Sequence, residues 1–153
     1  MSQRVGSVLH VEDEMFDVTL VQRIFEKHGI LNAIHRAANG IEALAMLRGG
    51  EGREPLEKPD LILLDMNMPR MGGIEFLREL RADPQLKDII VVMLATHLRD
   101  EEKAVALDFS AAGLILKGEI AEDGSKLISL LEEFWCVPPG RSSPSKVLQL
   151  KPR

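Results

Sequence analysis

The fold of this chain is decided by residues 61–73, which have the sequence LILLDMNMPRMGG. The four consecutive apolar residues at its start predict a strand buried on both faces, and the Pro and Gly residues that follow Asp65 predict a turn directly after the strand. Ligands of open α/β sheets bind at the carboxyl ends of the strands, which makes Asp65 a candidate site residue. Because Asp also commonly begins turns and caps helices, this stretch alone leaves both interpretations open.

The size and composition of the chain indicate one domain. Its 153 residues, 45% of them hydrophobic, can bury a sizeable core. A formal net charge of -5 argues against nonspecific nucleic-acid binding, which needs a basic face. Residues 1–4 lack an apolar signal core and no apolar run approaches the roughly 20 residues that span a bilayer, so we expect a cytoplasmic protein without a membrane partner. The single cysteine, Cys136, excludes an internal disulfide and a cysteine-based metal site.

Short β-rich segments alternate with segments of helical periodicity along the whole chain. The pattern predicts five strands and five helices, and therefore an α/β fold of the flavodoxin-like (βα)5 type, a doubly wound parallel sheet of five strands in the order 2-1-3-4-5. We expect the domain to cover residues 1–136 and a C-terminal arm or tail to cover 137–153, where prolines prevent the last helix from continuing. The strands are predicted at 6–12, 33–37, 61–64, 89–94 and 113–116, and the helices at 15–27, 39–47, 74–83, 100–107 and 122–135.

Polar residues follow four of these strands at the edge of the sheet that their carboxyl ends share: Glu12 and Asp13, Asp65, Thr96 and Lys117. Clustered carboxylates repel one another by about 4 kcal/mol per pair at 4 Å and an effective dielectric of 20, so they need a positive partner. Lys117 supplies one charge, and Mg²⁺ suits a site of carboxylates with retained waters. An aspartate beside a metal, a hydroxyl and an ammonium is equipped to accept a phosphoryl group as nucleophile.

Each of these residues also has an ordinary structural explanation. The acids at 12–14 favour the N-terminus of the following helix electrostatically. Thr96 is also typical of a helix cap, and Lys117 of a solvated surface lysine. Only their coincidence at one edge of the sheet favours a site.

The acidic pair, the stretch from Asp65 to Gly73, Thr96 after the fourth strand and Lys117 after the fifth resemble the receiver domain of two-component response regulators, over about residues 5–135. Within that family the chain is most similar to the single-domain regulators that accompany bacterial and cyanobacterial phytochromes. The narrower likeness lies in the loop before the third strand, in residues 80–84 and in the aromatic pair at 134–135.

The resemblance implies a stand-alone regulator that is phosphorylated on Asp65 by a sensor histidine kinase, with a phytochrome kinase as the expected donor and a downstream phosphotransfer protein as a further partner. It implies no enzymatic action beyond self-catalysed phosphotransfer and slow dephosphorylation. It also implies that Thr96 and Lys117 contact the phosphoryl group. The implied Mg²⁺ ligands are Asp13, Asp65 and the backbone carbonyl of Asn67, with Glu12 acting through water.

Three positions depart from the family pattern. Leu114 stands where receivers usually have a Tyr or Phe whose inward swing reports phosphorylation, which leaves that switch without its aromatic residue. Gly118 follows Lys117 where the family has a proline in a cis peptide, and a cis bond before a non-proline residue costs several kcal/mol. His97 occupies a position that is normally small, where it could shield the site or contact a partner. These departures motivate an alternative, a phosphate-independent interaction or dimerisation module built on the receiver fold.

A third interpretation, an enzyme or flavin protein on the same fold, fits the residues less well. A flavin site needs a phosphate cradle rich in Gly, Ser and Thr after the first strand, where this chain has acids. A phosphatase of the dehalogenase type needs a second Asp two residues after the nucleophile, where this chain has Asn67.

We also expect a homodimer. The apolar residues of the last predicted helix exceed what one sheet face needs, and an apolar patch of that kind often marks an interface. The segment after residue 136 would extend to the partner subunit, although its Pro and Ser content equally suits a disordered tail. The interface candidates are Phe134, Trp135, Val147, Leu148 and Leu150.

Overall fold

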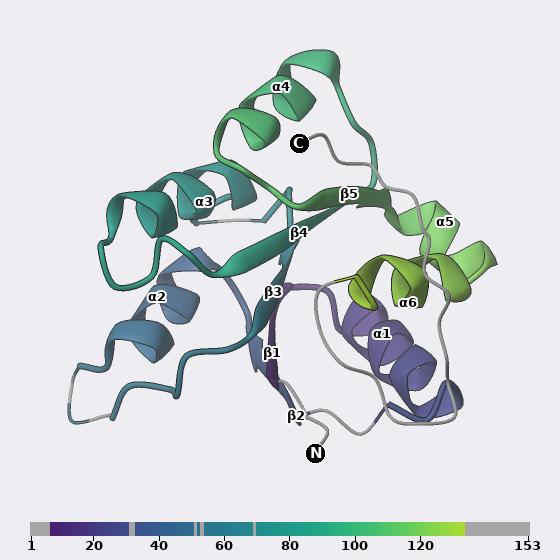
Figure 1. Cartoon of the computed structure of the whole chain (residues 1–153), viewed down its shortest axis with the longest axis horizontal. Helices are drawn as coiled ribbons and strands as arrows, with labels where there is room; N and C mark the ends of the chain where they lie inside the picture. The colour runs from purple at the N-terminus through teal and green to yellow at the C-terminus, as the bar shows by residue number, and fades with distance from the viewer. Residues whose placement is uncertain (1–6, 31–32, 51, 53, 69, 134–153) are drawn as a thin grey trace.

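The computed structural model describes residues 7–30, 33–50, 52, 54–68 and 70–133, which form a parallel sheet with helices on both faces (Figure 1). The 5-stranded sheet has the order β2-β1-β3-β4-β5, which confirms the predicted topology. The elements are β1 (Ser7–Val11), α1 (Met15–Lys27), β2 (Ala33–Ala37), α2 (Gly40–Arg48), β3 (Leu61–Asp65), α3 (Gly73–Ala82), β4 (Ile90–Ala95), α4 (Asp100–Asp108), β5 (Gly113–Leu116), α5 (Lys117–Glu122) and α6 (Ser125–Leu131).

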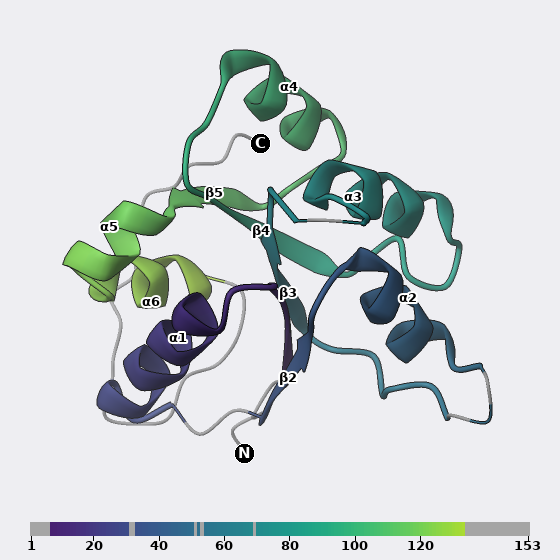
Figure 2. The ribbon, with the colours of Figure 1, turned by 180° about the vertical axis from the view of Figure 1, so that it is seen from behind.

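The sheet separates two hydrophobic layers. Helices α2, α3 and α4 cover one face and helices α1, α5 and α6 the other, as Figures 1 and 2 show from opposite sides. Successive side chains of a strand point to opposite faces, so the apolar run of β3 supplies both layers: Ile62 and Leu64 to the first, Leu61 and Leu63 to the second. All five residues of β3 are buried, as its continuous apolar sequence predicts.

The parallel register brings the carboxyl ends of four strands to one edge. Asp65, the last residue of β3, is paired with Leu94 of β4, and Leu64 with Val11 of β1. Ala95 of β4 is paired with Leu116 of β5. The residues that follow these strands therefore start from neighbouring positions.

The turn after β3 passes very close to the end of the strand, and it requires a glycine. The backbone N–H of Gly73 donates to the carbonyl oxygen of Met66 at 3.0 Å. A Cβ at this position would overlap the carbonyl oxygen of Asp65 and would lie 2.8 Å from the Cα of Met66. Helix α3 can therefore begin directly behind Asp65 only because residue 73 has no side chain.

The last predicted helix, at 122–135, is wrong in its start. Two short helices occur instead: α5 begins at Lys117 itself, and α6 begins at Ser125. They are separated by Asp123, whose backbone is extended and whose side chain accepts hydrogen bonds from the N–H and Oγ of Ser125 at 3.1 and 2.7 Å. Asp competes with the helix for backbone donors in this way, and helical periodicity alone does not register it. None of the described helices has the length and apolarity needed to cross a membrane.

The apolar residues of α6 are used inside the molecule. Leu127, Ile128, Leu130 and Leu131 are all buried, and Leu130 packs so closely on Gly113 that a Cβ there would lie 2.8 Å from Leu130 Cδ2. The expected apolar excess on the last helix is therefore wrong for its described part, because helix and β5 approach closely enough to bury it. Several predictions fall on residues 134–153, which lie outside the described residues. These are the tail at 137–153, Cys136 and the interface candidates Phe134, Trp135, Val147, Leu148 and Leu150.

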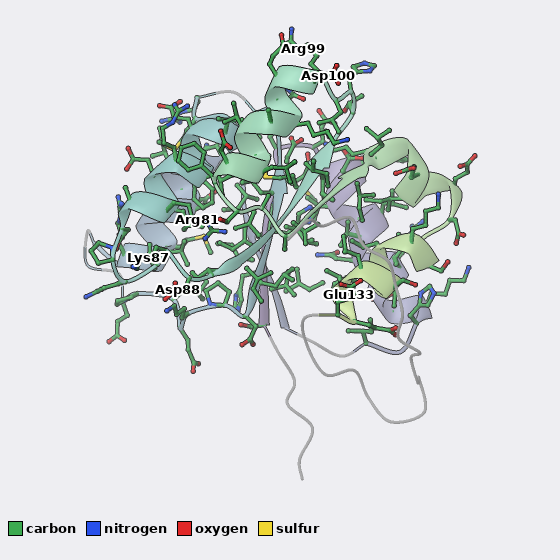
Figure 3. The ribbon with its side chains drawn as sticks, turned by 45° about the horizontal axis from the view of Figure 1, so that its top comes forward. Arg81, Lys87, Asp88, Arg99, Asp100 and Glu133 are labelled. Carbon is green, nitrogen blue, oxygen red and sulfur yellow. The ribbon has the colours of Figure 1, made fainter. Side chains whose placement is uncertain are left out.

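Arg81 of α3, which is labelled in Figure 3, binds the backbone that follows α4. The Arg81 guanidinium donates to four carbonyl oxygens, at 2.7 to 3.2 Å, from the turn before β4 and from the residues after α4. Arg78 also lies over the ring of Phe109, 5.5 Å from its centroid. Ala106 is the only buried residue of α4, so contacts at the residues after the helix add to a small buried face.

Candidate functional site

Three carboxylates meet at the carboxyl edge of the sheet. Glu12 and Asp13 follow β1 and Asp65 ends β3, and one carboxylate oxygen from each lies within 4.8 Å of the others. Glu12 and Asp65 are buried, at 0% and 2% exposure, while Asp13 is half-buried. The structure thus brings together the three acids that the strand ends predict, with Asp13 on the side open to solvent.

The ammonium group of Lys117 lies among these acids. Its Nζ is 3.0 Å from Glu12 Oε2, 2.9 Å from Asp17 Oδ2 and 3.2 Å from Asp65 Oδ1. An ammonium has three donors, and here three carboxylate oxygens surround it. We call Glu12, Asp13, Asp17, Asp65 and Lys117 together the acidic site.

Asp17 is a member that the sequence analysis missed. It lies in the first turn of α1, one helical turn after Asp13, and its side chain is 21% exposed. The spacing of four residues between two acids at a helix start is the local signal that could have drawn attention to it. The spacing does not indicate that Asp17 contacts Lys117, because the two residues are 100 positions apart in the chain.

Burial changes the proton affinity of these groups. Burial, with the charge of Asp65, raises the pKa of Glu12 to about 7, against the opposing effect of Lys117. Burial also raises the pKa of Asp65 above its ordinary value, again opposed by Lys117. The burial of Lys117 disfavours its charged form, but its hydrogen bonds to Asp17 and Glu12 and the charge of Asp65 outweigh this and raise its pKa. The lysine is therefore charged throughout the physiological range, while Glu12 takes up a proton near neutral pH.

A fully buried histidine lies beneath the acidic site. His10 of β1 places Nε2 3.8 Å from Glu12 Oε1, and neither ring nitrogen nor Glu12 Oε1 has a hydrogen-bond partner among the described residues. Burial and the charge of Lys117 lower the pKa of His10 to about 4, so the ring is neutral at neutral pH. His10 was not predicted as a site residue, because a histidine inside a strand has no local sign of burial.

Arg36 of β2 holds the loop that carries Glu12 and Asp13. Its Nε and Nη2 donate to the carbonyl oxygen of Glu12 at 3.1 and 3.0 Å, and Nη2 also donates to that of Asp13 at 3.3 Å. Hydrogen bonds from a guanidinium are stronger than those between neutral groups. Arg36 therefore fixes the backbone from which two of the carboxylates project, a role that the sequence pattern did not indicate.

Asn67 and Thr96 lie at the same edge. The backbone N–H of Asn67 donates to Asp65 Oδ1 at 3.3 Å and helps to orient that carboxylate, and the Asn67 residue is exposed. Thr96 directly follows β4 and is exposed, as is His97. The structure thus places Thr96 next to the strand end that pairs with β3, with its side chain accessible to solvent.

Two of the three departures from the family pattern lie in and after β5. Leu114 is half-buried and packs against the layer formed with α2, α3 and α4, so an aliphatic side chain occupies the usual aromatic position. Gly118 is exposed, and a Cβ added to it would meet no atom within 4 Å. The described peptide bonds include no cis bond, so Lys117 and Gly118 are joined in the trans form.

The acidic site fits a hard divalent cation. Glu12, Asp13 and Asp65 offer only oxygen, and Glu12 Oε1 lacks a partner among the described residues. Oxygens bound to one Mg²⁺ at 2.0 to 2.1 Å lie roughly 3 to 4 Å apart, and the three carboxylate oxygens lie within 4.8 Å of one another, which is close to that spacing. The donor set and its spacing therefore suit Mg²⁺ held by carboxylates and water.

Comparisons with known proteins agree with this geometry. The family model of the response regulator receiver domain matches residues 8–132. Response regulator Rcp1 of Synechocystis sp. is 31% identical over 128 residues, which cover 84% of this chain and 87% of that protein. The structure of the phosphorylated cyanobacterial phytochrome response regulator RcpA is 31% identical, with a TM-score of 0.77, and the match covers 86% of this chain and 94% of that one. The Mn²⁺-bound form of Rcp1 is 29% identical, with a TM-score of 0.76, over 92% of this chain and 99% of that one.

Proposed function

The chain belongs to the family of response regulator receiver domains, and we propose that it works by accepting a phosphoryl group on Asp65 from the phosphohistidine of a sensor kinase, with Mg²⁺ as cofactor. One observation carries the proposal: a buried carboxylate at a strand end has an ammonium at 3.2 Å and two further carboxylates beside it. That arrangement combines a nucleophile, a fixed cation and a set of metal ligands.

Each residue has a distinct part in the proposed transfer. A carboxylate oxygen of Asp65 attacks phosphorus, the bond between phosphorus and the donor imidazole breaks, and its electron pair returns to the imidazole nitrogen. Lys117 is placed to neutralise a phosphoryl oxygen, and Thr96 to donate a hydrogen bond to another. Glu12, Asp13, Asp65 and the carbonyl of Asn67 would hold the Mg²⁺, which when bound supplies positive charge for the phosphoryl oxygens.

In this proposal the chain is a phosphoacceptor rather than an enzyme with a separate substrate. Self-catalysed transfer and slow self-dephosphorylation are the only reactions assigned to it. The carboxylate is consumed as phosphate is added, so one turnover leaves the protein itself modified.

The proposed donor is a phytochrome kinase in the cytoplasm. The name of one similar solved structure supports this, because RcpA is a cyanobacterial phytochrome response regulator. A purified phytochrome kinase should phosphorylate the chain faster than an unrelated sensor kinase of equal activity. Equal rates would contradict the assignment of the donor but not the role of Asp65.

Homodimerisation and transfer to a downstream phosphotransfer protein complete the proposal. Residues 137–153 are the proposed arm between subunits, with Val147, Leu148 and Leu150 as its apolar contacts. Phe134 and Trp135, which precede the arm, are the other proposed interface residues. Light scattering of the chain truncated after Trp135 tests it, because an unchanged dimer mass would remove the arm from the interface.

The deciding experiment is phosphoryl uptake from a small donor. Incubation with Mg²⁺ and acetyl phosphate should add one phosphoryl group to the wild type, measured by intact-protein mass spectrometry. Asp65→Asn should take up none, whereas the matched control Asp108→Asn, at the exposed end of α4, should behave as wild type. Equal labelling of Asp65→Asn would show that the acceptor is a different residue.

The alternative is a phosphate-independent interaction module on the same fold. The aliphatic Leu114 in the aromatic position favours it, because the usual reporter of phosphorylation is replaced. Calorimetry distinguishes the two functions: no Mg²⁺ binding together with no phosphoryl uptake would support this alternative.

A further inference from the structure

Lys117 pairs with three carboxylates that have different fates in the proposed reaction. Asp65 is the phosphoacceptor, and Glu12 belongs with Asp13 and Asp65 to the set of oxygens that fits a cation. Asp17 belongs to neither group, yet its Oδ2 is the oxygen nearest to Lys117 Nζ, at 2.9 Å. Asp17 is therefore the only one of the three partners that stays a free carboxylate when a cation and a phosphoryl group are present.

We propose that Asp17 is a positioning residue that holds the Lys117 ammonium beside Asp65 throughout the phosphorylation reaction. This inference rests on the proposed function and deepens it. It assigns a part in phosphoryl transfer to a residue of α1 that does not itself touch phosphorus.

The surroundings of Lys117 explain why such an anchor is needed. The lysine is the first residue of α5, and the next residue, Gly118, is exposed and has open space around it. Gly118 therefore contributes no side chain that could hold Lys117 in place. A lysine side chain is a flexible stem with a point charge, so its position depends on the charges that it meets.

Asp17 is well placed to supply that restraint. It lies in the first turn of α1, where its backbone N–H donates to the carbonyl oxygen of Glu14 at 3.0 Å, so its position is fixed by the helix. Side chains on a helix hold a neighbouring group more accurately than side chains on a loop. Helices α1 and α5 cover the same face of the sheet (Figure 2), and the Asp17–Lys117 contact joins the first turns of these two helices.

Phosphorylation changes the two other partners but not this one. When Asp65 Oδ1 or Oδ2 bonds to phosphorus, the carboxylate becomes an acyl phosphate and loses its own charge. Glu12 shares its charge with the bound cation. The hydrogen bond from Lys117 to Asp17 can persist while another of its N–H donors moves from Asp65 to a phosphoryl oxygen.

A double-mutant cycle tests the inference through the phosphorylation rate. Asp17→Asn should slow uptake from acetyl phosphate at saturating Mg²⁺, on the order of tenfold, because a misplaced cation stabilises the transition state less. In a Lys117→Met background the same substitution should change the rate by less than about twofold, the range expected of an absent coupling. Asp17→Glu should recover part of the rate. An equal slowing in both backgrounds would overturn the inference, as would an unchanged rate in Asp17→Asn.

A second measurement does not depend on phosphorylation. The held ammonium of Lys117 should give a slowly exchanging NH₃⁺ signal in ¹H–¹⁵N NMR spectra, assigned by its loss in Lys117→Met. The signal should disappear in Asp17→Asn and remain in Glu26→Gln, which removes an exposed acid of the same helix. Circular dichroism shows whether each variant is folded.

The two measurements separate failure of the inference from failure of the proposed function. A wild type that takes up no phosphoryl group but shows the Asp17-dependent signal would reject the proposed function alone. A wild type that is phosphorylated, with an NH₃⁺ signal unaffected by Asp17→Asn, would reject the role of Asp17 alone.

Discussion

Replacing Glu12 by glutamine should stabilise the metal-free protein, and the gain should depend on pH. Glu12 is fully buried, and its pKa is raised from 4.5 to about 7 by burial and by the charge of Asp65. Each pKa unit corresponds to 1.36 kcal/mol, so ionised Glu12 costs the folded state about 3 kcal/mol above pH 7. The amide keeps the shape of the side chain but makes a weaker hydrogen bond to Lys117, which leaves an expected net gain of about 1 to 3 kcal/mol at pH 8.

The sign of the pH dependence follows from linkage. A carboxyl group whose pKa is raised on folding contributes stability below its unfolded value, here 4.5, and loses it as the pH rises through about 7. The advantage of Glu12→Gln should therefore be less than about 1 kcal/mol at pH 5 and should reach its full size near pH 8.

Urea unfolding followed by circular dichroism, with a chelator present, measures this difference at the two pH values. The matched control is Glu14→Gln, an exposed acid two residues along the same loop, which should stay within about 0.5 kcal/mol of wild type at both. Saturating Mg²⁺ should stabilise the wild type more than Glu12→Gln, because only the folded wild type keeps the full set of ligands. A loss of stability at pH 8, or an equal gain at pH 5 and pH 8, would refute the account of Glu12 as a strained buried acid.

Three further predictions concern the surroundings of the acidic site and the attachment of α4. Gly73→Ala should lower the free energy of unfolding by at least about 2 kcal/mol, because the added Cβ would overlap the backbone at the end of β3. The control Gly118→Ala, which has open space around it, should be neutral or stabilise α5 by up to about 1 kcal/mol. Thermal unfolding compares the two variants, and equal effects would contradict the close approach at Gly73. Arg81→Met should lower the free energy of unfolding by about 2 to 4 kcal/mol, because four carbonyl oxygens lose their hydrogen-bond donor. The control Arg78→Met, which loses one contact with the Phe109 ring, should lower it by less than about 1 kcal/mol in the same urea assay. A smaller loss for Arg81→Met would show that water takes over the hydrogen bonds of the guanidinium. The pKa of His10 is lowered to about 4, so its contribution to stability is present above pH 6.5 and is lost as the pH falls toward 4. His10→Leu should therefore make the free energy of unfolding depend less on pH between 6.5 and 4. An unchanged slope would indicate that His10 has the same pKa in the folded and unfolded states.

The sequence by itself determined the fold and the edge at which the acidic site forms. The apolar run of β3, with no polar alternation, predicts an interior strand buried on both faces, and the acids at the carboxyl ends of β1 and β3 mark where these strands end. These are local properties, since periodicity and turn residues act over a few positions, and parallel strands necessarily bring their carboxyl ends together. The turn after Asp65 also followed from its Pro and Gly residues, whereas the close approach of Gly73 to the end of β3 is a finding of the structure.

Only the tertiary structure decided which groups touch and how they ionise. The pairing of Lys117 with Asp17 joins residues 100 positions apart, and Arg36 reaches the carbonyl of Glu12 from a separate strand. The burial of His10 and the raised pKa of Glu12 arise from the low-dielectric surroundings that the whole sheet and its helices create. From the sequence, the last helix was predicted to carry more apolar residues than one sheet face can bury. That prediction was wrong for α6, because helical periodicity shows that a face is apolar but not what covers it. Contacts between distant segments depend on how complete layers pack, and no local pattern of residues records that packing.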